Sequence, residues 1–239
     1  MIKFFRNIRQ KLLLEGKTAN YLKYAIGEIV LVVFGILIAL QFNNWNNNQK
    51  DKKLEKRYLS DIIQDLKADS IAIADFKKES DEQVRTKNKL VDYYNGQSFA
   101  HDSLVLYFDA QWKPVYNFTP ILTTLEEMKS TGNIGVITNI SLRRKILETY
   151  NSYQVHIQKN EVIYNRLQEE FWKIILSKLP NLPLDYASET LNNFDVETAL
   201  KDFEIKNRLM LNHVKGMNNG IKNLQNINNQ LLIELRSKL

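Results

Sequence analysis

The sequence predicts an all-α protein with a single transmembrane helix followed by an elongated antiparallel helical bundle. The first observation is the stretch from Tyr24 to Phe42, which is about as long as a bilayer-spanning helix and carries one formal charge, Glu28. The second is the chain after Asp51, where apolar residues recur at alternating spacings of three and four. The third is the scarcity of helix breakers, since the chain has only 4 prolines and 8 glycines.

These observations divide the chain into three parts. We expect a cytoplasmic basic amphipathic arm over residues 1–23, a transmembrane helix over residues 24–45 and a helical domain over residues 46–239. In the arm, Phe4, Ile8 and Leu12 lie near one helical face and basic residues near the other, which is typical of a helix lying on an anionic membrane surface. A basic arm without fixed structure is the alternative.

The distribution of basic residues predicts the orientation in the membrane. Residues 1–23 carry six lysines and arginines and one acid, whereas the chain after the span carries 27 of the 33 basic and 25 of the 27 acidic residues. Positive charge beside a span marks its cytoplasmic side. We therefore expect a cytoplasmic N-terminus, with the helical domain on the other side. The formal net charge of +6 thus indicates a lipid bilayer as partner and not nucleic acid.

Glu28, Gly35 and Ala39 share one face of the span, because they recur at spacings of seven and four. Gly35 and Ala39 form a small pair that lets two helix backbones approach, and a carboxylate on that face would avoid lipid by meeting a neighbouring helix. We expect this face to be a helix–helix interface in a homo-oligomer or with a membrane partner. Two alternatives stay open: Glu28 carries protons, or its carboxylate reaches the cytoplasmic headgroups.

The helical domain is expected to contain three long helices, over residues 52–94, 141–179 and 202–237. Polar residues take one apolar slot in each of them, and these residues are Asp69, Asn160 and Asn228. A polar residue in such a seam fixes register or oligomeric state at a cost in stability. An ordinary bundle core with a partly exposed edge is the alternative.

Shorter helices are expected between the long ones, over residues 102–109 and 196–200. Thr119 is expected to cap a further helix that has Pro120 at its first position and ends near Gly132. Asn139 is likewise interpreted as the cap of the second long helix.

Residues that could carry catalysis do not converge in the sequence. The chain has no cysteine, and its 3 histidines lie on separate segments without the spacing of a metal site. No glycine-rich phosphate loop or nucleophile motif occurs. We therefore expect a protein that is not an enzyme and that uses no cofactor and no metal.

Aromatic residues cluster between the first two long helices and form the best candidate for a recognition surface. The candidate residues are Tyr107, Trp112, Tyr116 and Phe118. Aromatic side chains in a loop can line a binding groove or anchor an interface. The alternative is that they fill the end of the bundle.

Two segments carry a resemblance to a known family. They are IKFFRNIRQKLLLEGKTANYLKYAIGEIVLVVFGILIALQFNNWN at the start of the chain and TTLEEMKSTGNIGVITNISLRRKILETYN further on, about a third of the chain together. They resemble an uncharacterised family of single-pass membrane proteins from Bacteroidetes, a domain of unknown function. The resemblance implies an inner-membrane anchor with a periplasmic domain, and it implies no activity and no catalytic residues.

The sequence therefore predicts a non-enzymatic inner-membrane protein that acts as a scaffold, adaptor or accessory subunit of an envelope complex. Two other functions stay open. One is a periplasmic sensor domain that signals through a partner, because only about 23 residues are left for the cytoplasmic side. The other is an ion- or proton-coupled oligomer that uses Glu28.

Overall fold

The structure is a computed structural model that describes residues 18–111, 118–178, 195–211 and 214–238. All regular secondary structure in these ranges is helical, which confirms the all-α class. The helices are, in chain order, α2 (Thr18–Tyr94), α3 (His101–Asp109), α4 (Thr123–Ser130), the 3-10 helix η1 (Asn133–Val136), α5 (Ile140–Lys178), α7 (Val196–Lys201), α8 (Phe203–Leu211) and α9 (Val214–Arg236). The chain forms two compact units, Met1–Lys56 and Arg57–Leu239.

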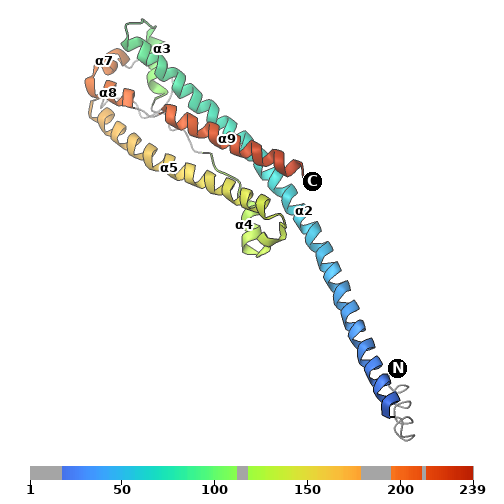
Figure 1. Cartoon of the computed structure of the whole chain (residues 1–239). Helices are drawn as coiled ribbons and strands as arrows, with labels where there is room; N and C mark the ends of the chain where they lie inside the picture. The colour runs from blue at the N-terminus through green and yellow to red at the C-terminus, as the bar shows by residue number, and fades with distance from the viewer. Residues whose placement is uncertain (1–17, 112–117, 179–194, 212–213, 239) are drawn as a thin grey trace. The chain divides into compact units, whose positions relative to one another are not determined.

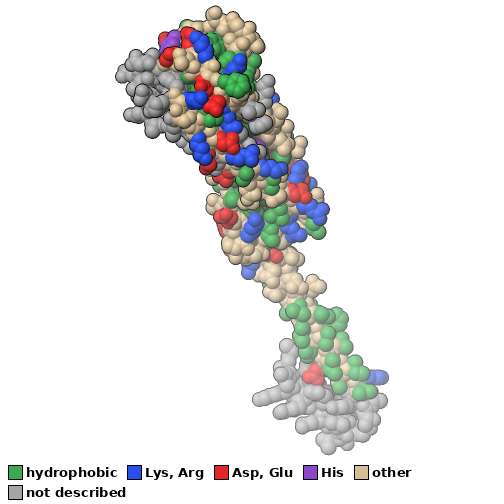
Figure 2. Space-filling view, turned by 90° about the vertical axis from the view of Figure 1, so that its left-hand side faces the viewer, with side chains coloured by type: hydrophobic (Ala, Val, Ile, Leu, Met, Phe, Trp, Pro, Cys, Tyr) green, Lys and Arg blue, Asp and Glu red, His purple; other side chains and the backbone are tan. Residues whose placement is uncertain are grey.

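The first unit contains the part of α2 that is long and apolar enough to cross a membrane. No residue of its most apolar 18-residue window is buried, and Figure 2 shows the continuous band of apolar side chains. The helix continues without a break through the asparagine-rich residues 43–48, where the sequence offers neither proline nor glycine. The span and the first long helix of the bundle are therefore one helix.

In the second unit, α2 packs with α5 and α9 around a core of apolar side chains. The predicted core positions of α2 are buried, and these residues are Leu59, Ile62, Leu66, Ile73 and Phe76. Tyr150 and Tyr153 of α5 add large buried rings, and the two rings meet edge to face at 5.7 Å. The spacing of three and four residues in the sequence thus marks the buried face of these helices.

The three long helices of this unit do not all alternate in direction (Figure 1). Helix α9 runs antiparallel to α2, since Asn228 contacts Ser70 while Asn218 contacts Asp81 further along α2. Helix α5 runs antiparallel to α9, because Lys145 pairs with Glu234 while His156 lies against Gly220. Since α9 is antiparallel to α2, α5 runs parallel to α2.

The far end of α2 is closed by the short helices α3, α7 and α8. A cluster of buried apolar residues joins them: Leu90, Leu104, Val105, Phe108, Val196, Ala199, Leu200, Ile205 and Leu209. Asp195 caps α7 by accepting a hydrogen bond from the Thr198 amide at 3.0 Å, and Asp202 caps α8 through the Glu204 and Ile205 amides. Gly96, with a φ of 98°, ends α2 as the Asn95-Gly96 pair predicts.

Two predicted helix starts have different outcomes. Asn139 caps α5, because its Oδ1 accepts a hydrogen bond from the Leu142 amide at 3.0 Å. The prediction for Thr119 and Pro120 is wrong, since α4 begins only at Thr123. The acceptors for the Ile121 and Thr124 amides come from α2 and not from the local sequence.

Helices α5 and α9 approach each other closely at Gly220. A Cβ atom on Gly220 would lie 2.3 Å from Cε1 of the half-buried His156 ring, whereas a Cβ on Gly216 of the same helix would meet nothing within 4 Å. The two glycines of α9 therefore have different roles, and only Gly220 is required by the packing.

We expect Gly220→Ala to lower the midpoint of thermal unfolding of the full chain in detergent, because overpacking of this kind costs about 1–3 kcal/mol. Gly216→Ala is the matched control and should raise stability by about 0.5–1 kcal/mol, since alanine favours a helix over glycine. His156→Ala should remove most of the Gly220→Ala penalty. Equal effects of the two glycine substitutions would contradict this close approach.

Candidate functional site: the polar face of α2

Helix α2 carries a row of polar residues at the start of the second unit. Arg57, Asp61, Asp65 and Asp69 follow one another at spacings of four, and Tyr58 lies beside the first of them. Residues four apart are neighbours on a helix surface. We call these five residues the polar face of α2. Their hydrogen-bond partners from other segments lie within residues 118–133.

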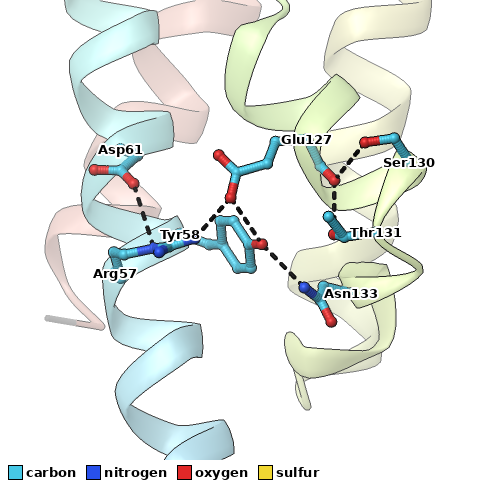
Figure 3. A network of polar contacts seen from close by, with 7 residues as sticks. All are labelled: Arg57, Tyr58, Asp61, Glu127, Ser130, Thr131 and Asn133. Carbon is cyan, nitrogen blue, oxygen red and sulfur yellow. Dashed lines mark hydrogen bonds and ion pairs between the residues drawn. The ribbon is translucent and has the colours of Figure 1, made fainter.

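Glu127 of α4 accepts two hydrogen bonds from the first residues of the polar face (Figure 3). Its Oε1 lies 2.7 Å from Nη2 of Arg57 and 3.1 Å from the Tyr58 hydroxyl. Asn133 of η1 in turn donates to the Tyr58 hydroxyl at 3.1 Å. The Tyr58 ring is buried, whereas the Arg57–Glu127 pair is about half exposed, so burial of the ring contributes more stability than the ion pair does.

Two carboxylates of the polar face accept hydrogen bonds from the backbone that leads into α4. Oδ1 of Asp69 accepts from the Ile121 amide at 2.9 Å, and Oδ2 of Asp65 accepts from the Thr124 amide at 3.3 Å. Amides in the first turn of a helix have no partner within that helix. The carboxylates of α2 therefore do for this segment what a local cap residue does elsewhere.

Asp69 is fully buried, and only one of its oxygens is paired. Its Oδ2 and the buried Tyr150 hydroxyl have no hydrogen-bond partner among the residues that the structure describes. Burial raises the pKa of Asp69 to about 6 from an ordinary value of 3.8, the Ile121 amide opposes this shift, and the charge of Asp65 adds to it. Asp69 thus changes its charge close to neutral pH.

Asn228 of α9 joins all three long helices at the same level of the core. Its amide nitrogen donates to the Leu66 carbonyl of α2 at 3.1 Å and to the Tyr153 hydroxyl of α5 at 2.8 Å. Its oxygen accepts from the Ser70 hydroxyl at 2.8 Å. A one-residue shift of α9 would leave these buried groups unpaired, so Asn228 fixes the register of the bundle.

The predicted site residues fall in several places. Asp69 and Asn228 lie in the core, whereas the side chain of Asn160 lies outside the described part of the chain. Glu28, Gly35 and Ala39 lie on α2 in the first unit. Glu28 is half-buried, and a Cβ on Gly35 would meet nothing within 4 Å.

The aromatic residues do not form one described surface. Phe118 is buried and contacts the Tyr153 ring at 5.2 Å, whereas Tyr107 packs against the cluster at the end of α2. Trp112 and Tyr116 lie outside the described residues. Phe118 and Tyr107 therefore contribute to packing in different parts of the unit.

Sequence reasoning identified Asp69 and Asn228 as polar residues in core slots but not their partners. Asp65 and Glu127 were missed, because their roles depend on contacts between segments far apart in the sequence. The spacing of Asp61, Asp65 and Asp69 by four was the signal that could have marked the polar face.

The described residues contain no group of three or more His, Asp or Glu side chains that could hold a metal ion. What the polar face offers chemically is hydrogen bonding at its exposed end and proton binding at Asp69.

One protein family matches this chain, and its description is a family of unknown function (DUF6090), over residues 28–177. The match covers most of α2, all of α3 and α4, and α5 almost to its end. No curated protein and no solved structure matches the chain.

We expect Asn228→Ala to reduce the free energy of unfolding by about 2–3 kcal/mol, because it leaves buried polar partners on two helices unpaired. The exposed neighbour Asn229→Ala is the control and should change stability by no more than about 0.5 kcal/mol. Thermal unfolding of the full chain, followed by circular dichroism, measures both. A loss in the control as large as that in Asn228→Ala would contradict the role of Asn228.

Proposed function

Because the chain belongs to DUF6090, a family of unknown function, we propose a function from its own physical features. The protein is a non-enzymatic scaffold, adaptor or accessory subunit of an envelope complex, anchored in the inner membrane by α2. Its N-terminus is cytoplasmic and its helical unit is periplasmic.

The observation that carries this proposal is the complete exposure of the apolar part of α2. Side chains such as Ile29, Phe34 and Ile38 are 60–67% exposed, and none of the most apolar window is buried. A continuous apolar surface of this length is unstable in water and matches the thickness of a bilayer. The helical unit buries its own apolar residues, so α2 anchors a unit that folds around a separate core.

The face made of Glu28, Gly35 and Ala39 supports an association of the span with a second helix, either of another copy or of a membrane partner. Gly35 has open space where a side chain would be, which allows a close approach of backbones. Gly27 lies about 100° away from Glu28 around the helix and has the same open space. The two glycines can therefore be compared directly.

The association is tested by extracting the protein in mild detergent and identifying chains that co-purify by mass spectrometry. We expect Gly35→Leu to reduce the recovered partner or the oligomer at least fivefold, because the larger side chain holds the two backbones apart. Gly27→Leu adds the same bulk away from the face and should leave the assembly unchanged. A Cβ atom at either position would meet no described atom of the chain within 4 Å, so the two substitutions are matched in this respect.

A monomer without partners in the unsubstituted protein would contradict the scaffold role. Equal loss of assembly in Gly27→Leu and Gly35→Leu would contradict the proposed face but not the association itself.

The orientation is tested with single cysteines, because the chain contains none of its own. We expect Lys238→Cys, at an exposed position after α9, to react in intact cells with a maleimide that passes the outer but not the inner membrane. Asn7→Cys should react only after the inner membrane is opened. The reverse pattern of labelling would contradict the cytoplasmic N-terminus.

A further inference from the structure

The position of the connection from residue 118 to α4 is fixed by a hydrogen bond to Asp69 of α2. Among the residues that the structure describes, the side-chain acceptor for the Ile121 amide is the Asp69 carboxylate, at 2.9 Å. Asp69 is buried, and its second oxygen has no partner in the described residues. A charge in such a position is costly, whereas a neutral carboxyl group can keep Oδ1 as an acceptor for Ile121.

We propose that Asp69 is a proton-operated latch, which holds residues 118–130 on α2 when it is protonated and loosens them when it ionises. This device lies beyond the scaffold role and does not depend on it. It gives the helical unit two states that differ in one proton and in the attachment of one segment.

The hydrogen bond from the Ile121 amide favours the charged form of Asp69, but burial outweighs it and the other groups around Asp69 do not stabilise a charge. On α2, the carboxylate of Asp65 lies one turn away and repels a second negative charge. On α5, the hydroxyl groups of Tyr150 and Tyr153 are both within electrostatic reach, and burial raises the pKa of each, so both stay neutral. On α9, Asn228 is neutral and its nitrogen is already engaged by Leu66 and Tyr153.

The direction of the response follows from linkage. The pKa of Asp69 is about 6 in the closed unit and has an ordinary value of 3.8 in water. A carboxyl with a raised pKa stabilises the closed form fully below its ordinary pKa, and this stabilisation is lost as the pH rises through about 6. The opening equilibrium of the segment should therefore rise roughly fiftyfold between pH 4 and pH 8.

Release of residues 118–130 from α2 would also change the contacts at the start of the helical unit. Residues 121–124 lead directly into α4, and α4 carries Glu127, the acceptor for Arg57 and Tyr58. Arg57 is the first residue of the second unit and follows the membrane-anchoring unit directly in the chain. Proton binding at Asp69 thus acts on the contacts of the residues where the bundle begins (Figure 3).

Hydrogen exchange of the full chain in detergent micelles, followed by mass spectrometry from pH 4 to pH 8, tests the latch. Exchange rates are divided by the intrinsic rates at each pH to give protection factors. In the unsubstituted protein, the protection of residues 118–130 should fall roughly fiftyfold, with most of the fall between pH 4 and pH 6, and should level off above about pH 6. Residues 221–235 of α9 should stay more protected at every pH, because opening is confined to the segment.

Two matched variants complete the test. Asp69→Asn keeps an acceptor for Ile121 without a charge, so protection of residues 118–130 should become independent of pH. Asp75→Asn removes an exposed carboxylate from the same helix and should keep the response of the unsubstituted protein.

Three results would overturn the latch. The first is constant protection of residues 118–130 in the unsubstituted protein, which decides the matter even if Asp69→Asn does not fold. The second is a pH response that survives in a folded Asp69→Asn variant. The third is equal loss of protection in residues 118–130 and 221–235, which would show that the whole unit opens.

Discussion

Backbone amides that enter a helix need acceptors, and in this protein Asp65 and Asp69 of α2 supply them to the chain before and within α4. The Asp69 bond to Ile121 is 2.9 Å long and Asp69 is buried, so the segment cannot leave α2 without exposing or unpairing both groups. Once the segment is fixed, α4 brings Glu127 to Arg57 and Tyr58, and α5 starts on the side where it runs parallel to α2. The attachment of α4 to α2 therefore depends on these two carboxylates.

The same helix has two different kinds of surface along its length. In the first unit α2 exposes apolar side chains on all sides, whereas in the second unit it buries one apolar face and carries a polar face beside it. A helix that is apolar all round suits lipid, and a helix with one apolar stripe suits a bundle. The change occurs within one continuous helix. Both the apolar segment and the first helix of the bundle therefore belong to α2.

Much of the fold could be predicted from the sequence, because the spacing of apolar residues is a local property. The first two long helices, the Asn139 cap and the buried polar slots of Asp69 and Asn228 all follow from patterns within one segment. The single helix expected over residues 202–237 is described as two helices, α8 and α9. The start of α4 could not be predicted, since Thr119 and Pro120 form a good local signal while the actual acceptors lie more than 50 residues earlier in the chain. The parallel direction of α5 relative to α2 could not be predicted for a related reason. The direction of a helix depends on its contacts with distant segments, and apolar spacing within the helix does not reveal them.

The attachment of α4 and its proposed response to pH both depend on the charge state of Asp69. Carbon-13 NMR of the side-chain carboxyl groups, with the Asp69 signal assigned by its absence in Asp69→Asn, measures this charge directly in the full chain. We expect a titration midpoint near pH 6 for this one aspartate. A midpoint at the ordinary value of 3.8 would show that water reaches the carboxylate, and it would be incompatible with a buried contact between Asp69 and Ile121.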